Sequence, residues 1–115
     1  MFVATTQNAI EQELFCAENA RLTGNEGKAR VCARRAAGIA VLAYFRAIGI
    51  AFSDPSAFAL LNRFMQMEST PKHMKEITSR LLIRVNPDYS IPAKIDLLED
   101  ARQLTAWVSE NIYGE

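Results

Sequence analysis

Histidine, cysteine and glycine are scarce in this sequence. Its 115 residues include one histidine, two cysteines, five glycines and four prolines. With so few histidine and cysteine ligands, and with the two cysteines at a separation that matches no zinc-binding pattern, we predict no metal site. No cofactor is expected, because Gly24 and Gly27 lack the spacing of the glycine-rich loops that hold nucleotide phosphates.

Catalytic clusters are also missing. His73 forms a single H-x-x-E pair with Glu76, whereas di-iron bundles use such pairs from two helices together with further glutamates. Nothing places His73 beside Cys16 or Cys32, so neither thiol has an evident general base. We therefore predict no catalytic residue and interpret His73 as exposed or packed at one end of the fold.

The chain has no net charge and no long apolar run. Thirteen basic residues balance thirteen acidic ones, so no overall field attracts nucleic acid or an anionic membrane. The first nine residues lack the basic and apolar regions of a signal peptide, and the longest apolar stretch, Ala36 to Phe45, ends at Arg46. We expect a cytoplasmic protein without a membrane partner.

The two cysteines lie equally far on either side of Gly24. An antiparallel helical hairpin that turns at Gly24 would bring Cys16 and Cys32 close together, so the geometry permits a disulfide. The reducing cytosol argues against one, and free cysteines commonly act as small buried apolar residues. The expectation is two free thiols.

What is present is helical periodicity from end to end. Half of the residues are apolar, and they recur at helical spacing in five segments, approximately 5–22, 26–48, 55–67, 71–85 and 92–112. Residues that stop or start helices stand between these segments: Gly24 with Asn25, Asp54 with Pro55, and Thr70 with Pro71. The sequence predicts one domain, 1–115, that is a compact all-α, antiparallel up-down bundle of four to five helices.

The second predicted helix carries a stripe of alanines. At 100° per residue, one narrow face receives Ala29, Ala33, Ala36, Ala40 and Ala43. Small side chains let a neighbouring helix approach closely. We interpret this face as a contact with the first helix or as a dimer interface.

Basic residues concentrate between Arg21 and Arg46. This segment contains one acidic residue, Glu26, and the basic residues Arg21, Lys28, Arg30, Arg34, Arg35 and Arg46. On the second predicted helix, Arg30 and Arg34 share one flank, and Lys28 and Arg35 share another. Two interpretations stay open. The cations pair with acidic residues of the first and last helices, or they form an anion-binding strip that contacts nucleic-acid phosphates.

Several segments together resemble a known family. They are a short acidic first helix, a leucine-bearing third helix, and the stretches GNEGKARVCARRAAGIAVLAY, RLLIRVNPDYS and IDLLEDARQLTAWV. In their order along the chain, these segments resemble a HEPN domain (higher eukaryote and prokaryote nucleotide-binding). The resemblance implies an antiparallel helical bundle that is frequently dimeric, in a family of ribonuclease toxins, partners of minimal nucleotidyltransferases and non-catalytic members.

The ribonuclease motif of that family is missing. The motif is an arginine followed four to six residues later by a histidine, but here Arg63 precedes His73 by ten residues, and Arg80 and Arg84 follow it. The resemblance therefore implies a degenerate member without nuclease activity.

Three functions follow from these observations. The first is a non-catalytic helical module that forms a homodimer and acts as a scaffold or binds a protein partner, such as one encoded by a neighbouring gene. The second is a nucleic-acid- or nucleotide-associated protein, either a divergent ribonuclease or a toxin–antitoxin component, with RNA as its partner. The third is an apolar small-molecule site between helices.

Overall fold

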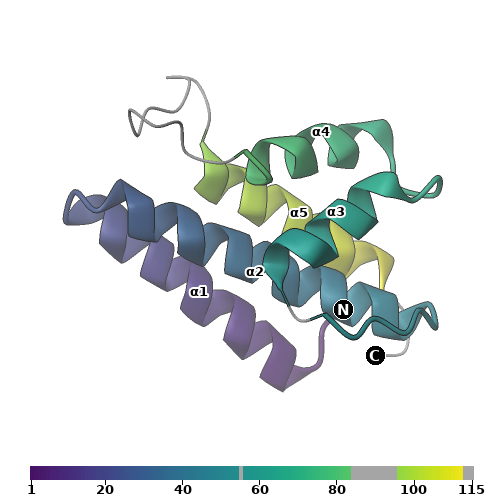
Figure 1. Cartoon of the computed structure of the whole chain (residues 1–115). Coiled ribbons are helices and arrows are strands. Elements are labelled where there is room, and N and C mark those ends of the chain that lie inside the picture. Colours follow the sequence, from purple (N-terminus) through teal and green to yellow (C-terminus); the bar gives the residue numbers. More distant parts are fainter. Residues whose placement is uncertain (55, 84–95, 113–115) are drawn as a thin grey trace.

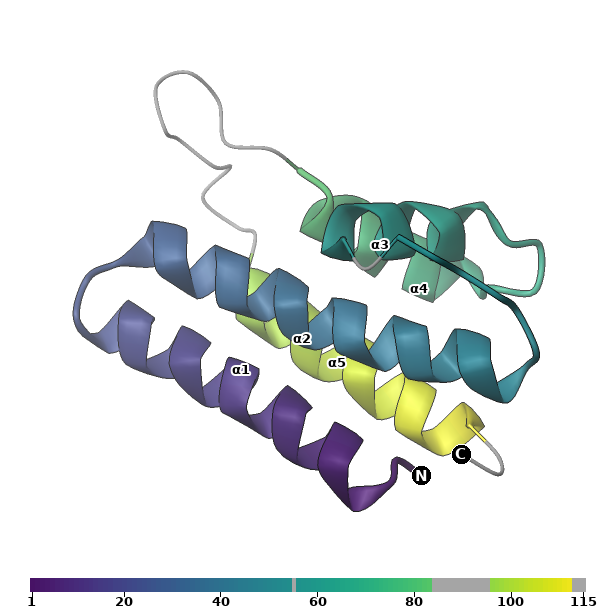
Figure 2. The ribbon, with the colours of Figure 1, turned by 60° about the horizontal axis from the view of Figure 1, so that its bottom comes forward.

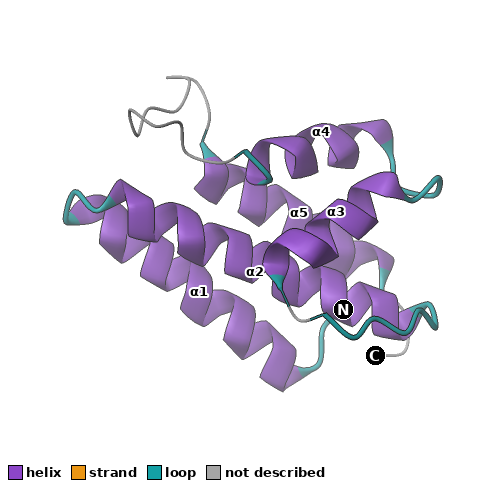
Figure 3. Cartoon of the chain, in the orientation of Figure 1, coloured by secondary structure: helices purple, strands orange, loops and turns teal. Residues whose placement is uncertain are grey.

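The computed structural model describes residues 1–54, 56–83 and 96–112, and within these ranges every regular element is a helix (Figures 1 and 3). The helices are α1 (Ala4–Leu22), α2 (Glu26–Ala47), α3 (Ala57–Gln66), α4 (Lys72–Leu81) and α5 (Leu97–Asn111). The predicted compact all-α fold of five helices is confirmed. The fourth helix is shorter than predicted, because Leu82 and Ile83 are not helical. Val85 and Pro92, the predicted end and start of helices four and five, lie outside the described residues.

Helix α2 is the centre of the arrangement. It pairs with α1 as an antiparallel hairpin and also packs against α3 and α5, while α3 and α4 lie on one side of the three longer helices (Figures 1 and 2). The end of α1 lies near the start of α5, where Arg21 Nη2 donates to Asp96 Oδ1 at 3.0 Å. Helix α5 is therefore antiparallel to α1 and runs in the same direction as α2.

The α1–α2 turn forms as the sequence predicts. Gly24 adopts a φ of +81°, a left-handed conformation that favours glycine. The Asn25 side chain then accepts a hydrogen bond of 3.1 Å from the Lys28 N–H and caps α2. This short connection places the two helices side by side.

The starts of α3 and α4 differ from prediction. Ser56, not Asp54, caps α3 by accepting from the Ala59 N–H at 3.4 Å. Asp54 Oδ1 instead accepts from the Ser56 N–H at 2.9 Å, so two good capping residues stand close together and the later one is used. Pro55 lies outside the described residues. The Thr70 hydroxyl donates back to the Phe64 carbonyl at 2.7 Å and does not cap α4.

The core combines the small residues of α2 with large side chains, which come from α2 itself and from the other helices. The largest fully buried side chains include Phe45, Phe64 and Ile10. Trp107, predicted to seal one end of the bundle, is half-buried with its ring centroid 5.6 Å from Tyr44 and 5.9 Å from Phe64. Tyr113, given the same role by the sequence, lies outside the described residues.

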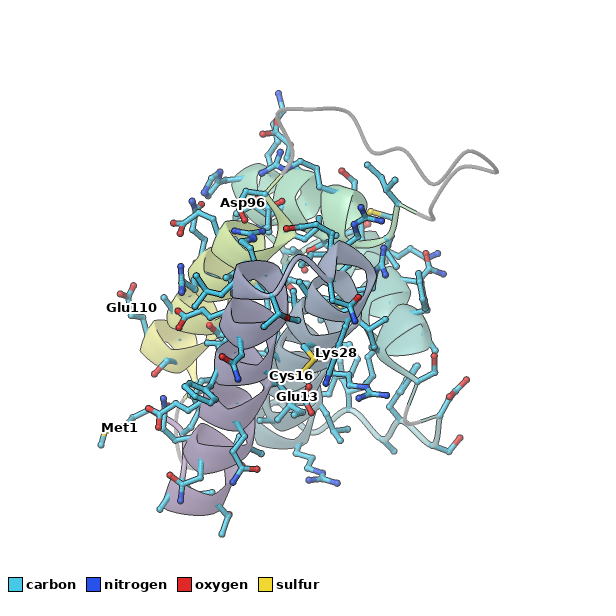
Figure 4. The ribbon with its side chains drawn as sticks, turned by 90° about the vertical axis from the view of Figure 1, so that its left-hand side faces the viewer. Met1, Glu13, Cys16, Lys28, Asp96 and Glu110 are labelled. Atoms are coloured by element: carbon cyan, nitrogen blue, oxygen red, sulfur yellow. A yellow bond between two sulfur atoms is a disulfide. The ribbon has the colours of Figure 1, made fainter. Side chains whose placement is uncertain are left out.

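Cys16 and Cys32 form a disulfide between α1 and α2, so the expectation of two free thiols is wrong (Figure 4). Their Cα atoms are 6.1 Å apart, within the usual range for a disulfide. The helical hairpin that the sequence predicts is compatible with this bond. The expectation of free thiols rested on cellular compartment and not on the distance between the residues.

Two findings bear on cellular location. Among the described helices, none is long and apolar enough to cross a membrane. The disulfide is a bond that persists mainly in oxidising compartments. The cysteines therefore give no support to the expected cytoplasmic location, which stays a prediction.

Candidate functional site

The alanine stripe of α2 is an internal contact. All five alanines are buried within the chain, and three of them have no exposed surface at all. The five are Ala29, Ala33, Ala36, Ala40 and Ala43. Because the neighbouring helices of the same chain already cover this face, it offers no surface to a second subunit. A dimer would have to use another face.

Arg34 is not available to bind a phosphate, which corrects its assignment as an anion contact. The residue is 7% exposed, and its guanidinium donates to the carbonyls of Leu81, at 2.7 Å, and Ile83. The guanidinium carbon also lies 5.2 Å from the centroid of the Phe58 ring. These carbonyls lie at the C-terminal end of α4, where the helix dipole places a partial negative charge. Arg34 therefore joins the end of α4 to the middle of α2.

Lys28, Arg30 and Arg35 are placed differently. Lys28 and Arg35 are exposed and Arg30 is half-buried. Among the described residues, no carboxylate lies within 4 Å of any of the three cations. The first interpretation was that these cations pair with acidic residues of neighbouring helices. In the described structure, Lys28, Arg30 and Arg35 form no such pairs.

The same interpretation included Arg21, which does pair with an acidic residue, and Arg80 and Arg102 form further ion pairs. Arg21 lies 3.0 Å from Asp96 and 3.6 Å from Glu26, and its hydrogen bond holds the pKa of Asp96 below the ordinary value. Arg80 makes two hydrogen bonds of 2.9 Å to the buried Asp100, which raise the pKa of the arginine. Arg102 pairs with Glu18. These ion pairs join α5 to α1 and α4. None of them includes Lys28, Arg30 or Arg35 of α2.

A pocket of about 520 Å³ lies between α1, α2 and the start of α3. Its apolar wall comes mainly from α2, where Val31, Ile39 and Leu42 follow one another along one face. Val31 is 43% exposed. The residues that line the pocket are Glu13, Val31, Arg34, Arg35, Gly38, Ile39, Leu42, Ser56, Ala57, Phe58 and Leu60.

Two side chains of opposite charge stand at this pocket. Glu13 projects from α1 toward α2 beside the disulfide (Figure 4), and its buried Oε2 has no hydrogen-bond partner among the residues that the structure describes. Arg35 faces the same pocket from α2, yet the two side chains form no ion pair. The sequence prediction included Arg35 but missed Glu13. Its position in the sequence could have indicated this. Glu13 and Arg35, like the two cysteines, lie at equal distances on either side of Gly24, so a hairpin that turns at Gly24 places them opposite each other.

Gly38 sets how closely α3 approaches α2 at this pocket. A Cβ atom at Gly38 would lie 3.0 Å from the Cβ and 3.2 Å from the Cα of Ala57. Contacts this short require the neighbouring backbone to shift. The absence of a side chain at Gly38 therefore allows the start of α3 to form one wall of the pocket.

The described residues contain no group of three or more histidine, cysteine, aspartate or glutamate side chains that could hold a metal ion. His73 is exposed in the first turn of α4 and lies away from the pocket residues in the sequence.

Comparisons with known proteins found no match among family models, curated proteins or solved structures. The HEPN resemblance stays a prediction from the sequence.

Proposed function

We propose that this chain is a non-catalytic module that binds a protein partner across the pocket surface, which we define as Glu13, Val31, Arg35, Ile39, Leu42 and Phe58. The observation that carries the proposal is the apolar row Val31, Ile39 and Leu42 on α2, which lines a pocket that the described chain leaves open. Exposed apolar patches with polar edges are typical of interaction sites.

The chemistry of the pocket surface suits a protein better than a small molecule. Arginine and aromatic residues are enriched in protein interfaces, and Arg35 and Phe58 supply both here. Small-molecule sites usually enclose most of their ligand, whereas Val31 and Arg35 are exposed to solvent. An open surface of this kind would leave part of a small ligand in water, whereas a protein partner can cover it.

Photocrosslinking in the cells that produce the protein tests this proposal. Val31 is replaced by the photoreactive p-benzoylphenylalanine, and the same replacement at the exposed Gln103 of α5 serves as the matched control. We expect a discrete protein adduct from position 31 and none from position 103. Equal labelling at both positions, or none at position 31, would contradict a partner-binding role for the pocket surface.

A second candidate function, RNA binding, is favoured by one observation: Lys28, Arg30 and Arg35 have no carboxylate partner among the described residues. Three phosphate contacts would make the logarithm of the affinity for single-stranded RNA fall with the logarithm of salt concentration at a slope of about −2. Arg35→Ala should reduce the steepness of this slope by about 0.7. Fluorescence anisotropy with labelled RNA measures both slopes. No salt-dependent binding at low ionic strength would end this candidate.

A further inference from the structure

The outer face of α2 combines basic and apolar side chains in one row. At 100° per residue, positions separated by steps of three or four residues fall within an arc of about 80°. We call these positions the mixed row: Lys28, Val31, Arg35, Ile39, Leu42 and Arg46. The two residues Ile39 and Leu42 are half-buried, and the other members are exposed. The mixed row therefore continues the pocket surface along α2 in both directions, with one cation at each end and one between them.

The cations of the mixed row are available to a partner. Among the described residues, no carboxylate lies within 4 Å of Lys28, Arg35 or Arg46. Glu13 is the acidic residue that lines the pocket, but the chain itself covers its Oε2. The surface along the row is thus predominantly positive, although the chain has no net charge.

An acidic amphipathic helix has the chemistry that this row requires. A helix that lies in a groove binds through apolar side chains three, four and seven residues apart, and Val31, Ile39 and Leu42 present apolar contacts to such a helix. In paired helices, charged residues beside the apolar contacts determine the choice of partner. We infer that the partner docks an acidic amphipathic helix along the mixed row, with its carboxylates against the three cations. The inference rests on the proposed function, because it names the kind of protein that covers the same surface.

The length of the mixed row determines how long this helix must be. From Lys28 to Arg46 the row rises about 27 Å along the axis of α2. A partner helix needs about five turns to reach both end cations. Its acidic residues should stand about seven and about eleven residues apart, because Arg35 lies at these separations from the end cations.

Two other occupants fit the mixed row less well. Single-stranded RNA would satisfy the cations, but it stacks its bases on aromatic rings, and every apolar residue of the row is aliphatic. A second copy bound row against row would bring the cations of both copies together, which is repulsive. An acidic helix satisfies the cations and also removes the apolar row from water.

Charge reversal combined with the photocrosslink at position 31 tests the inference. In the chain that carries p-benzoylphenylalanine at position 31, the double variant Arg35→Glu, Arg46→Glu places carboxylates against those of the partner. The yield of the protein adduct should fall at least about tenfold. The matched control is Arg63→Glu, Lys72→Glu, which replaces two exposed cations of α3 and α4 and changes the net charge equally. This control should leave the yield unchanged.

The partner segment provides a second readout. Tandem mass spectrometry of the adduct identifies this segment, which should carry acidic residues beside apolar ones at helical spacing. Replacement of its acidic residues by lysine should restore the adduct of the variant Arg35→Glu, Arg46→Glu, and a purely structural effect would not be rescued in this way. Circular dichroism verifies that each variant folds. If the double variant does not fold, Arg35→Gln, Arg46→Gln takes its place and should lower the yield at least about threefold.

The outcomes separate this inference from the proposed function. The inference fails while the proposed function stands if the adduct survives charge reversal, if the control variant loses it equally, or if the crosslinked segment lacks acidic residues. An adduct that joins two copies of this chain also overturns the acidic helix as occupant. If position 31 forms no protein adduct, the proposed function fails as well, and salt-dependent binding of labelled RNA would then assign the cations to RNA.

Discussion

Reduction of the Cys16–Cys32 disulfide should lower the free energy of unfolding by about 3 kcal/mol. The bond joins residues 16 positions apart in the sequence, and a link of this length restricts the unfolded chain by about that amount. Urea denaturation, followed by circular dichroism with and without a phosphine reductant, measures the difference.

The double variant Cys16→Ser, Cys32→Ser is the control for this experiment. It removes the bond permanently, so the reductant should have no further effect on its unfolding midpoint. Its stability should also be close to that of the reduced wild-type chain, apart from the cost of burying hydroxyl groups. Equal midpoints for the wild-type chain with and without reductant would show that the disulfide does not stabilise the fold.

Arg34→Met should destabilise the fold by about 2–3 kcal/mol, because it leaves the carbonyls of Leu81 and Ile83 without their charged donor. Methionine keeps much of the length of the side chain, so the loss reports mainly on these hydrogen bonds and on the contact with the Phe58 ring. The measurement is urea denaturation at low protein concentration, where self-association contributes little.

The adjacent residue provides a matched comparison. Arg35 is exposed and forms no ion pair among the described residues, so Arg35→Met should change the free energy of unfolding by no more than about 0.5 kcal/mol. A large loss for Arg34 and a small one for Arg35 would confirm that neighbouring arginines serve different purposes. Equal losses would refute the anchoring role of Arg34.

The helices and the first turn could be predicted because their causes are local. Apolar spacing marks each helix, and the left-handed Gly24 with the cap Asn25 marks the turn of the α1–α2 hairpin. The start of α3 was placed wrongly because Asp54 and Ser56 both suit a helix cap. Local chemistry alone does not choose between two such residues.

The site could be predicted only in part, because its causes lie far apart in the chain. Sequence spacing grouped Arg34 with Lys28, Arg30 and Arg35, but the carbonyls that hold Arg34 belong to the end of α4. The sequence predicts the alanine face as a helix contact or a dimer interface, and only the packed fold shows that the chain itself covers these alanines. Glu13 gave no signal as a single residue, since its role depends on which residue of α2 lies opposite.

The contact between Gly38 and Ala57 also determines the width of the pocket surface. Since the backbone of α3 touches α2 at this position, any larger side chain there would move the Phe58 wall away from Val31 and Leu42. The shape of the pocket is therefore set in part by Gly38, a buried residue that itself lines the pocket. If the chain acts as the partner-binding module we propose, a larger residue at position 38 should change which partners fit the pocket while the other pocket residues stay the same.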